Sequence, residues 1–140
     1  MAVDRPVARP SGVAEGGWLP SDLAFQLFAE AGFPVSPWRL ARSRNEAIAA
    51  AEALGPPVVL KAELPGLVHK SDSGAVHLGL TTPRAVGEAY DDIAARLGAT
   101  EAILQRQARP GVELVIGARR DANFGPVVMA GLGGVWVEVL

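Results

Sequence analysis

The residue types best suited to chemistry lie in one short polar stretch and at the end of the apolar run before it. Within six residues the stretch brings together an imidazole, an ammonium, a hydroxyl, a carboxylate and a glycine: His69, Lys70, Ser71, Asp72 and Gly74. Cations and closely approached backbone amides are the groups that bind phosphoryl oxygens. Lys61, the only charge in the preceding apolar run, is a second cation for the same place. The set suits a phosphate site, although composition alone favours an exposed turn beside an edge-protecting lysine.

Two predicted strands must position these side chains. Residues 57–62 read PVVLKA, which predicts a buried strand that delivers Lys61 to its rim. Residues 63–74 are polar and rich in turn formers, and residues 75–80 predict another strand. The polar stretch is therefore expected to connect two strands.

Three helices are predicted around these strands. The first follows Ser21 and stops at Gly32 and Pro34, before a short extended segment over 35–41. The second begins at the capping-box spacing of Ser43 and Glu46 and ends at 55–57. The third begins at the pair Thr82-Pro83, carries apolar residues at spacings of four, three and four, and ends at Gly98.

Strands dominate the remainder of the chain. They are predicted over 101–107, 112–119 and 126–130, with a further strand over 135–140, and the intervening turns are placed at 109–111, 121–123 and 131–134. Because strands follow strands there, the pattern predicts an α+β fold with a mainly antiparallel sheet. The last strand would leave a hydrophobic edge, which we expect to reflect truncation, a covering partner or a homo-oligomer formed through that edge.

Composition excludes several classes of function. Fifteen acidic and thirteen basic residues give a net charge of −2, so we expect neither a nucleic-acid nor a membrane partner. Cysteine is absent, which excludes disulfides, thiolate metal sites and cysteine nucleophiles, and agrees with a cytoplasmic location. The charge-free stretch at 122–137 is interrupted by proline and glycine, and neither a signal peptide nor a metal-ligand cluster is predicted.

Five ordered blocks of sequence resemble a known family. The chain is similar to the ATP-grasp segment of ADP-forming acyl-CoA synthetases, the acetate–CoA ligase group related to succinyl-CoA synthetase, over about residues 19–140. The blocks are 32–35 (GFPV), 58–62 (VVLKA), 69–74 (HKSDSG), 111–117 (GVELVIG) and 124–134 (FGPVVMAGLGG). The resemblance implies a flexible lead-in over 1–17, the first ATP-grasp lobe over 18–107 and the beginning of the second lobe over 108–140, with the domain incomplete.

The resemblance also implies roles for individual residues. Lys61 corresponds to a phosphate-contacting lysine, and His69 to a histidine that relays a phosphoryl group between the nucleotide and a phosphohistidine on the CoA-binding half. Lys70, Ser71, Asp72 and Gly74 match a flexible loop that closes over phosphates. This sequence departs from the family at Ala75, where glycine is usually repeated and positive φ is easier.

Further along the chain, the resemblance implies contacts with the rest of the nucleotide. Gln105, Arg106 and Gln107 fall at the hinge between the lobes, where backbone groups meet the adenine edge and side-chain identity matters little. Glu113 matches an acidic residue near the ribose and phosphates. Arg119-Arg120-Asp121 reads as a charged turn outside the site.

The function that the resemblance implies is the nucleotide-binding part of an ADP-forming acid–CoA ligase. ATP or ADP would bind with Mg²⁺, whose ligands are expected beyond residue 140, and the partner would be a CoA-binding half or subunit. Two alternatives stay open. One is a non-catalytic module that senses a nucleotide or another ligand, like the ligase-like domains fused to protein acetyltransferases, and the other is a remnant without a stable fold.

Overall fold

The computed structural model describes residues 19–64 and 74–133 of the chain. The chain forms two compact units, Met1–Ala108 and Arg109–Leu140. Each unit is described by itself below.

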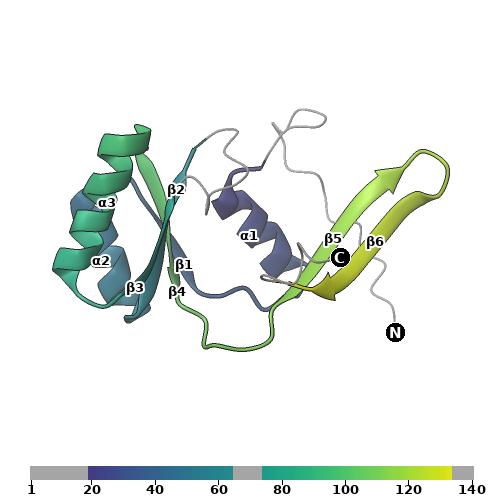
Figure 1. The fold of residues 1–140 in the computed structure, drawn as a ribbon, viewed down its shortest axis with the longest axis horizontal. Helices are drawn as coiled ribbons and strands as arrows, with labels where there is room; N and C mark the ends of the chain where they lie inside the picture. The colour runs from purple at the N-terminus through teal and green to yellow at the C-terminus, as the bar shows by residue number, and fades with distance from the viewer. Residues whose placement is uncertain (1–18, 65–73, 134–140) are drawn as a thin grey trace. The chain divides into compact units, whose positions relative to one another are not determined.

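A four-stranded antiparallel sheet forms the centre of the first unit. The strands lie in the order β1-β4-β2-β3, and every neighbouring pair is antiparallel. This arrangement, drawn in Figure 1, confirms the predicted α+β fold with an antiparallel sheet. The strands are β1 (Trp38–Ala41), β2 (Val58–Glu63), β3 (Val76–Leu80) and β4 (Glu101–Arg106).

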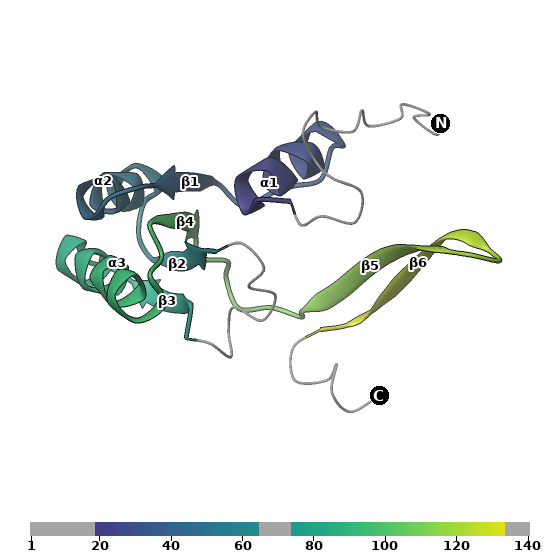
Figure 2. The same cartoon turned by 90° about the horizontal axis from the view of Figure 1, so that it is seen from above.

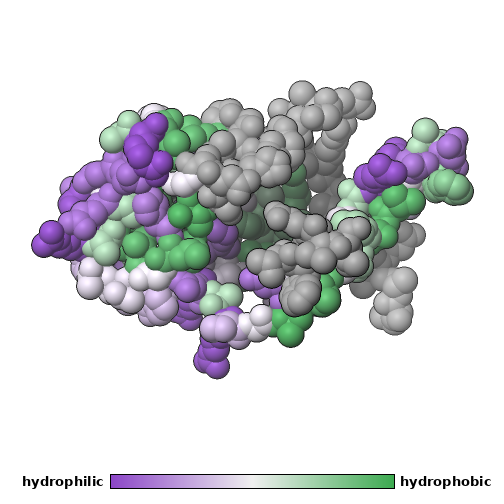
Figure 3. Space-filling view, viewed as in Figure 1, coloured by the Kyte–Doolittle hydropathy of each residue, from purple (hydrophilic) through white to green (hydrophobic). Residues whose placement is uncertain are grey.

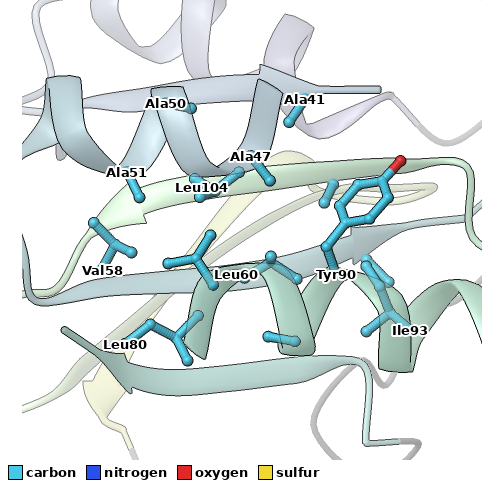
Figure 4. Packing of buried hydrophobic residues seen from close by; sticks show 14 of the residues in the cluster. Ala41, Ala47, Ala50, Ala51, Val58, Leu60, Leu80, Tyr90, Ile93 and Leu104 are labelled. Atoms are coloured by element: carbon cyan, nitrogen blue, oxygen red, sulfur yellow. The ribbon is translucent and has the colours of Figure 1, made fainter. Parts of the chain in front are cut away.

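Two helices, α2 (Arg44–Leu54) and α3 (Pro83–Leu97), cover one face of this sheet. Alternate residues of the two central strands point toward them, and Leu60 and Leu104 are fully buried there. Figure 4 shows these leucines packed against alanines of α2 and against Tyr90 and Ile93 of α3. The small alanine side chains let α2 lie close to the strands, so the core is built on this side.

Local capping explains where these two helices begin and end. Ser43 caps α2, because its hydroxyl accepts a hydrogen bond from the Glu46 backbone N–H. The Glu46 carboxylate in turn accepts from the backbone N–H of Arg42 rather than from that of Ser43. Thr82 caps α3 in the same way, and Gly98 ends it in the left-handed conformation with φ +66°. The predicted caps of both helices are therefore confirmed.

Helix α1 (Ser21–Glu30) lies on the opposite side of the sheet from α2 and α3 (Figures 1 and 2). Its first backbone N–H donates to the Glu63 carboxylate at 3.0 Å, and the Phe25 ring meets the Trp38 ring of β1 at a centroid distance of 5.7 Å. None of its residues is fully buried. These two contacts attach the helix to the sheet.

The described part of the second unit is a hairpin of β5 (Leu114–Asp121) and β6 (Gly125–Leu132). Asp121 closes the turn by accepting hydrogen bonds from the backbone of Asn123 and Phe124. The turn predicted over 131–134 is wrong at its first two residues, because Gly131 pairs with Val115 and β6 continues to Leu132. The strand predicted over 135–140, and the edge assigned to it, lie outside the described residues.

Large apolar side chains are exposed on the hairpin, some of them visible in Figure 3. They come from both strands: Leu114, Ile116, Val128, Met129 and Leu132. In the described part of the chain, no helix has both the length and the apolar composition needed to cross a bilayer.

Candidate functional site

The alternation of side chains along β2 places Lys61 on the face away from α2 and α3. Val58, Leu60 and Ala62 belong to the helix-side core, so Val59, Lys61 and Glu63 point the other way. Val59 is also buried, but it is not part of that core. The sheet therefore has one face that carries the apolar core and one face on which a cation and a carboxylate emerge beside apolar neighbours.

The Lys61 ammonium is held on that second face by an amide. Its Nζ donates to Gln105 Oε1 on β4 at 2.7 Å. The antiparallel register pairs Val59 with Gln105 and Lys61 with Ile103, so Lys61 and Gln105 are diagonal neighbours on one face. Because the Lys61–Gln105 hydrogen bond is partly buried, the ammonium stands in a partly desolvated place where a hydrogen-bonded partner stabilises its charge.

The contact gives Gln105 a role that the sequence interpretation missed. The sequence placed Gln105 at a hinge and gave its side chain little weight, whereas the side chain directs the candidate phosphate-binding cation. Lys61 and Gln105 are 44 residues apart in sequence. Only the register of two strands brings them together, and no local pattern reveals that register.

Glu63 and Ser21 are two further residues on this side that sequence reasoning did not single out. The Glu63 carboxylate accepts the hydrogen bond of the Ser21 backbone N–H, so the end of β2 carries the N-terminus of α1. Pro20 precedes that helix and gives it no side-chain cap. The Glu63 carboxylate on β2 therefore takes the place of an ordinary N-cap side chain. A negative charge near a helix N-terminus is stabilising, because it accepts from a free backbone N–H and interacts favourably with the helix dipole.

The connection between β2 and β3 carries the remaining phosphate-binding candidates. His69, Lys70 and Ser71 lie outside the described residues. Gly74 is described, and it has φ +65° where the chain returns toward the sheet. The Ala62 N–H donates to the Ala75 carbonyl at 2.8 Å and closes the base of the connection.

Ala75, the position that departs from the family, has a structural reason. No residue other than glycine has positive φ in the described part of the chain, so Ala75 needs none of the freedom that a second glycine would give. Its methyl group is fully buried in the helix-side core. An alanine therefore contributes apolar packing where a glycine would contribute none.

An ion-pair network holds Gly74 from the side of α3. Arg96 donates from Nε and Nη2 to the two oxygens of Asp92, at 2.7 and 2.6 Å, and from Nη2 to the Gly74 carbonyl at 2.8 Å. His77 Nε2 lies 3.0 Å from Asp92 Oδ2. The Arg96 hydrogen bond, with a smaller contribution from His77, lowers the pKa of the Asp92 carboxyl to about 2.

The structure places the other hinge side chains away from Lys61. The Arg106 guanidinium donates to the Leu54 carbonyl at the end of α2, so it serves the helix-covered side. Its backbone is also engaged, because its N–H donates to Pro37 and its carbonyl accepts from Ser36.

The remaining two candidates also make contacts of their own. Gln107 accepts from the Gly79 N–H of β3 at 2.7 Å. Glu113 belongs to the second unit, where its side chain is exposed and its carbonyl accepts from Gly133.

The arrangement is suited to binding an anion at the end of β2. One partly desolvated ammonium, oriented by an amide, supplies a point charge of the kind that matches phosphoryl oxygens. Among residues 19–64 and 74–133, no group of three or more His, Cys, Asp or Glu side chains is placed to hold a metal ion.

Comparisons with known proteins agree with the resemblance. Residues 13–140 match a family model described as an ATP-grasp domain. The chain is 40% identical over 115 residues to acetate–CoA ligase [ADP-forming] I of Archaeoglobus fulgidus, covering 78% of this chain and 17% of that protein. It is 38% identical over 116 residues to the beta subunit of acetate–CoA ligase [ADP-forming] I of Pyrococcus furiosus, covering 78% of this chain and 50% of the subunit.

Solved structures give the same result. The dinucleotide-forming acetyl-coenzyme A synthetase 1 of Ca. Korarchaeum cryptofilum, in complex with coenzyme A and Ca-AMPCP, has a TM-score of 0.75 and 41% identity, over 81% of this chain and 53% of that one. A second structure of that protein, with coenzyme A and Mg-AMPPCP, has a phosphohistidine segment pointing towards the nucleotide binding site. Its TM-score is 0.70 at 40% identity, over 88% of this chain and 53% of that one. This chain thus spans about half of the matched subunit and of the matched structures.

Proposed function

Because this chain belongs to the ATP-grasp family, we propose that it forms the nucleotide-binding and phosphoryl-relay part of an ADP-forming acid–CoA ligase. The complete system would interconvert acyl-CoA, phosphate and ADP with the free acid, CoA and ATP. The observation that carries the proposal is the Lys61 ammonium, oriented by Gln105 beside the connection that contains His69.

Lys61 would bind the phosphates of the nucleotide. Its hydrogen bond to Gln105 is partly buried, and a charge in such a place interacts more strongly with an anion than it does in bulk water. Lys70, Ser71 and Gly74 would contribute further donors and a closely approached backbone. We assign residues 105–107 to the adenine side and Glu113 to the ribose side, as the family resemblance implies. The N–H groups of Arg106 and Gln107 already donate to Pro37 and Pro57.

His69 would carry the phosphoryl group. In the direction of ATP use, a ring nitrogen of neutral His69 attacks the γ-phosphorus. The N–P bond forms as the bond from that phosphorus to its bridging oxygen breaks, and ADP leaves. The phosphoryl group then passes to a histidine of the CoA-binding half, and it travels in reverse when ATP is made. Positioning and charge would supply most of the catalysis.

Mg²⁺ is proposed to accompany the nucleotide, as in the relative described with Mg-AMPPCP. We assign its ligands to the region beyond residue 140, as the family resemblance implies. Bound Mg²⁺ would neutralise phosphate charge. The protein partner would be a CoA-binding half or subunit, since one relative is itself a beta subunit.

The assignment of Lys61 can be tested by thermal unfolding of the complete protein with and without ADP and Mg²⁺. We expect the nucleotide to raise the midpoint in the unaltered protein and in a control, Arg84→Ala on the exposed surface of α3. Lys61→Ala should abolish the rise. An undiminished rise in Lys61→Ala would refute the phosphate-binding role of this lysine.

A sensing module without catalysis is the second candidate. It would use the same nucleotide site but would not phosphorylate His69. Incubation of the complete protein with γ-labelled ATP separates the two, because acid-labile, base-stable label on His69 indicates the ligase, and binding without label indicates the sensor.

A further inference from the structure

The connection that carries His69 is held at both ends by charged side chains. Just beyond the Ala62–Ala75 hydrogen bond that closes its base, the β2 arm is attached to α1 by the contact between Glu63 and Ser21. The β3 arm is attached to α3, because Arg96 donates to the Gly74 carbonyl at 2.8 Å. The connection is therefore joined to elements on opposite sides of the sheet.

Arg96 is fixed before it reaches Gly74. Its guanidinium forms a fork on the two oxygens of Asp92, one turn earlier on α3, and Asp92 is contacted in addition by His77 of β3. A planar guanidinium with two of its nitrogens on one carboxylate has little rotational freedom left. Its remaining contact, with the Gly74 carbonyl, is thereby directed.

Gly74 fits this contact in two ways. Its φ of +65° is a conformation that other residues rarely adopt. A Cβ built at this position would also lie 3.1 Å from Nη1 and 3.3 Å from Nη2 of Arg96, so the guanidinium would have to move by a few tenths of an ångström. A glycine here allows both the backbone conformation and the close approach of the guanidinium.

We propose that Arg96, held by Asp92, is a positioning residue that fixes the backbone at Gly74 and so sets one anchor of the segment that presents His69 for phosphoryl transfer. The inference rests on the proposed function. Four residues lie between His69 and this anchor in the sequence. Because transfer requires the attacking nitrogen to be aligned within a few tenths of an ångström, a displaced anchor slows the chemical step more than it weakens nucleotide binding at Lys61.

The same helix offers a matched control. Arg84 and Glu88 form another ion pair with the i,i+4 spacing on α3, at 2.7 Å, and both side chains are exposed. Arg84 lies in the first turn of α3, three turns before Arg96. Arg84→Gln therefore removes the same chemical group from the same helix.

The experiment measures the rate of His69 phosphorylation by γ-labelled ATP and the KM for ATP, in the complete protein. We expect Arg96→Gln to lower the rate by about tenfold or more with KM changed less than about threefold, and Asp92→Asn to act in the same direction. Arg96→Lys should recover part of the rate, since it can still reach a carbonyl with one donor. Arg84→Gln should match the unaltered protein.

Three other results would overturn the role of Arg96, and only one of them would also overturn the proposed function. Normal labelling of a folded Arg96→Gln variant, with folding checked by its thermal midpoint, would overturn the inference and leave the proposed function intact. Equal losses in Arg96→Gln and Arg84→Gln would overturn it too, because the effect would then belong to the helix. No label on His69 in the unaltered protein would overturn the proposed function and the role of Arg96 with it.

Discussion

The two faces of the four-stranded sheet are built on different principles. The face under α2 and α3 is a continuous apolar core, in which Leu60 and Leu104 are fully buried. The opposite face keeps apolar residues such as Ile103 but places Lys61 and Gln105 among them. The first face supplies the stability that lets the second face hold a charge in a partly desolvated place. There the ammonium is hydrated less strongly and interacts more strongly with a bound anion.

Neighbouring residues on β2 offer the strongest test of this comparison. Leu60→Ala opens a cavity in the helix-side core and should lower the free energy of unfolding by about 3 kcal/mol. Denaturant unfolding of the complete protein, followed by circular dichroism, measures the loss. Lys61→Ala, the next residue, should change the free energy of unfolding much less while removing nucleotide protection. Similar stability losses in the two variants would contradict the division between the faces.

Neighbouring residues on β4 sharpen the comparison with a smaller effect. Gln105→Leu removes the acceptor that orients Lys61 and should weaken ADP binding about threefold to tenfold, the value of one hydrogen bond. The main effect of Arg106→Gln should instead be on stability, a loss of about 1 kcal/mol, since its guanidinium caps the end of α2. Isothermal titration with ADP and denaturant unfolding measure the two quantities. The comparison fails if Gln105→Leu leaves ADP affinity unchanged.

The local features of this fold could be predicted from the sequence. The caps at Ser43 and Thr82, and the strand that ends near Lys61, depend on residues within a few positions of one another, and the structure confirms them. Such features are encoded in spacing alone. The α+β class followed from the order of the predicted elements.

The contacts that shape the candidate site could not be predicted in this way. The pairs Lys61–Gln105, Ser21–Glu63 and Arg106–Leu54 join residues that are 44, 42 and 52 positions apart. They depend on strand register and on how helices dock, which a sequence pattern does not specify. The turn expected at Gly131 failed for a related reason: this glycine reads as part of a turn but continues β6, because Val115 of the partner strand pairs with it.

The smallest expected effect concerns Asp92, at the edge of the helix-covered side. Arg96 lowers the folded-state pKa of the Asp92 carboxyl to about 2 from an ordinary value of 3.8. The ionised carboxylate therefore stabilises the fold at pH values above that ordinary pKa. This contribution is lost as the pH falls from about 4 to about 2. Asp92→Asn should therefore be less stable than the unaltered protein near neutral pH, with the difference shrinking across that window.

Arg96→Gln removes the main cause of the shift and should flatten the same part of the pH profile. Thermal midpoints of the complete protein between pH 2 and pH 6, at low ionic strength, measure both variants. The side chains are partly exposed, so the effect should be far smaller than that of Leu60→Ala. Profiles of Asp92→Asn and the unaltered protein that run parallel through the window would show that the pair does not stabilise the fold. The contact of Arg96 with Gly74 would then have to be maintained without help from Asp92.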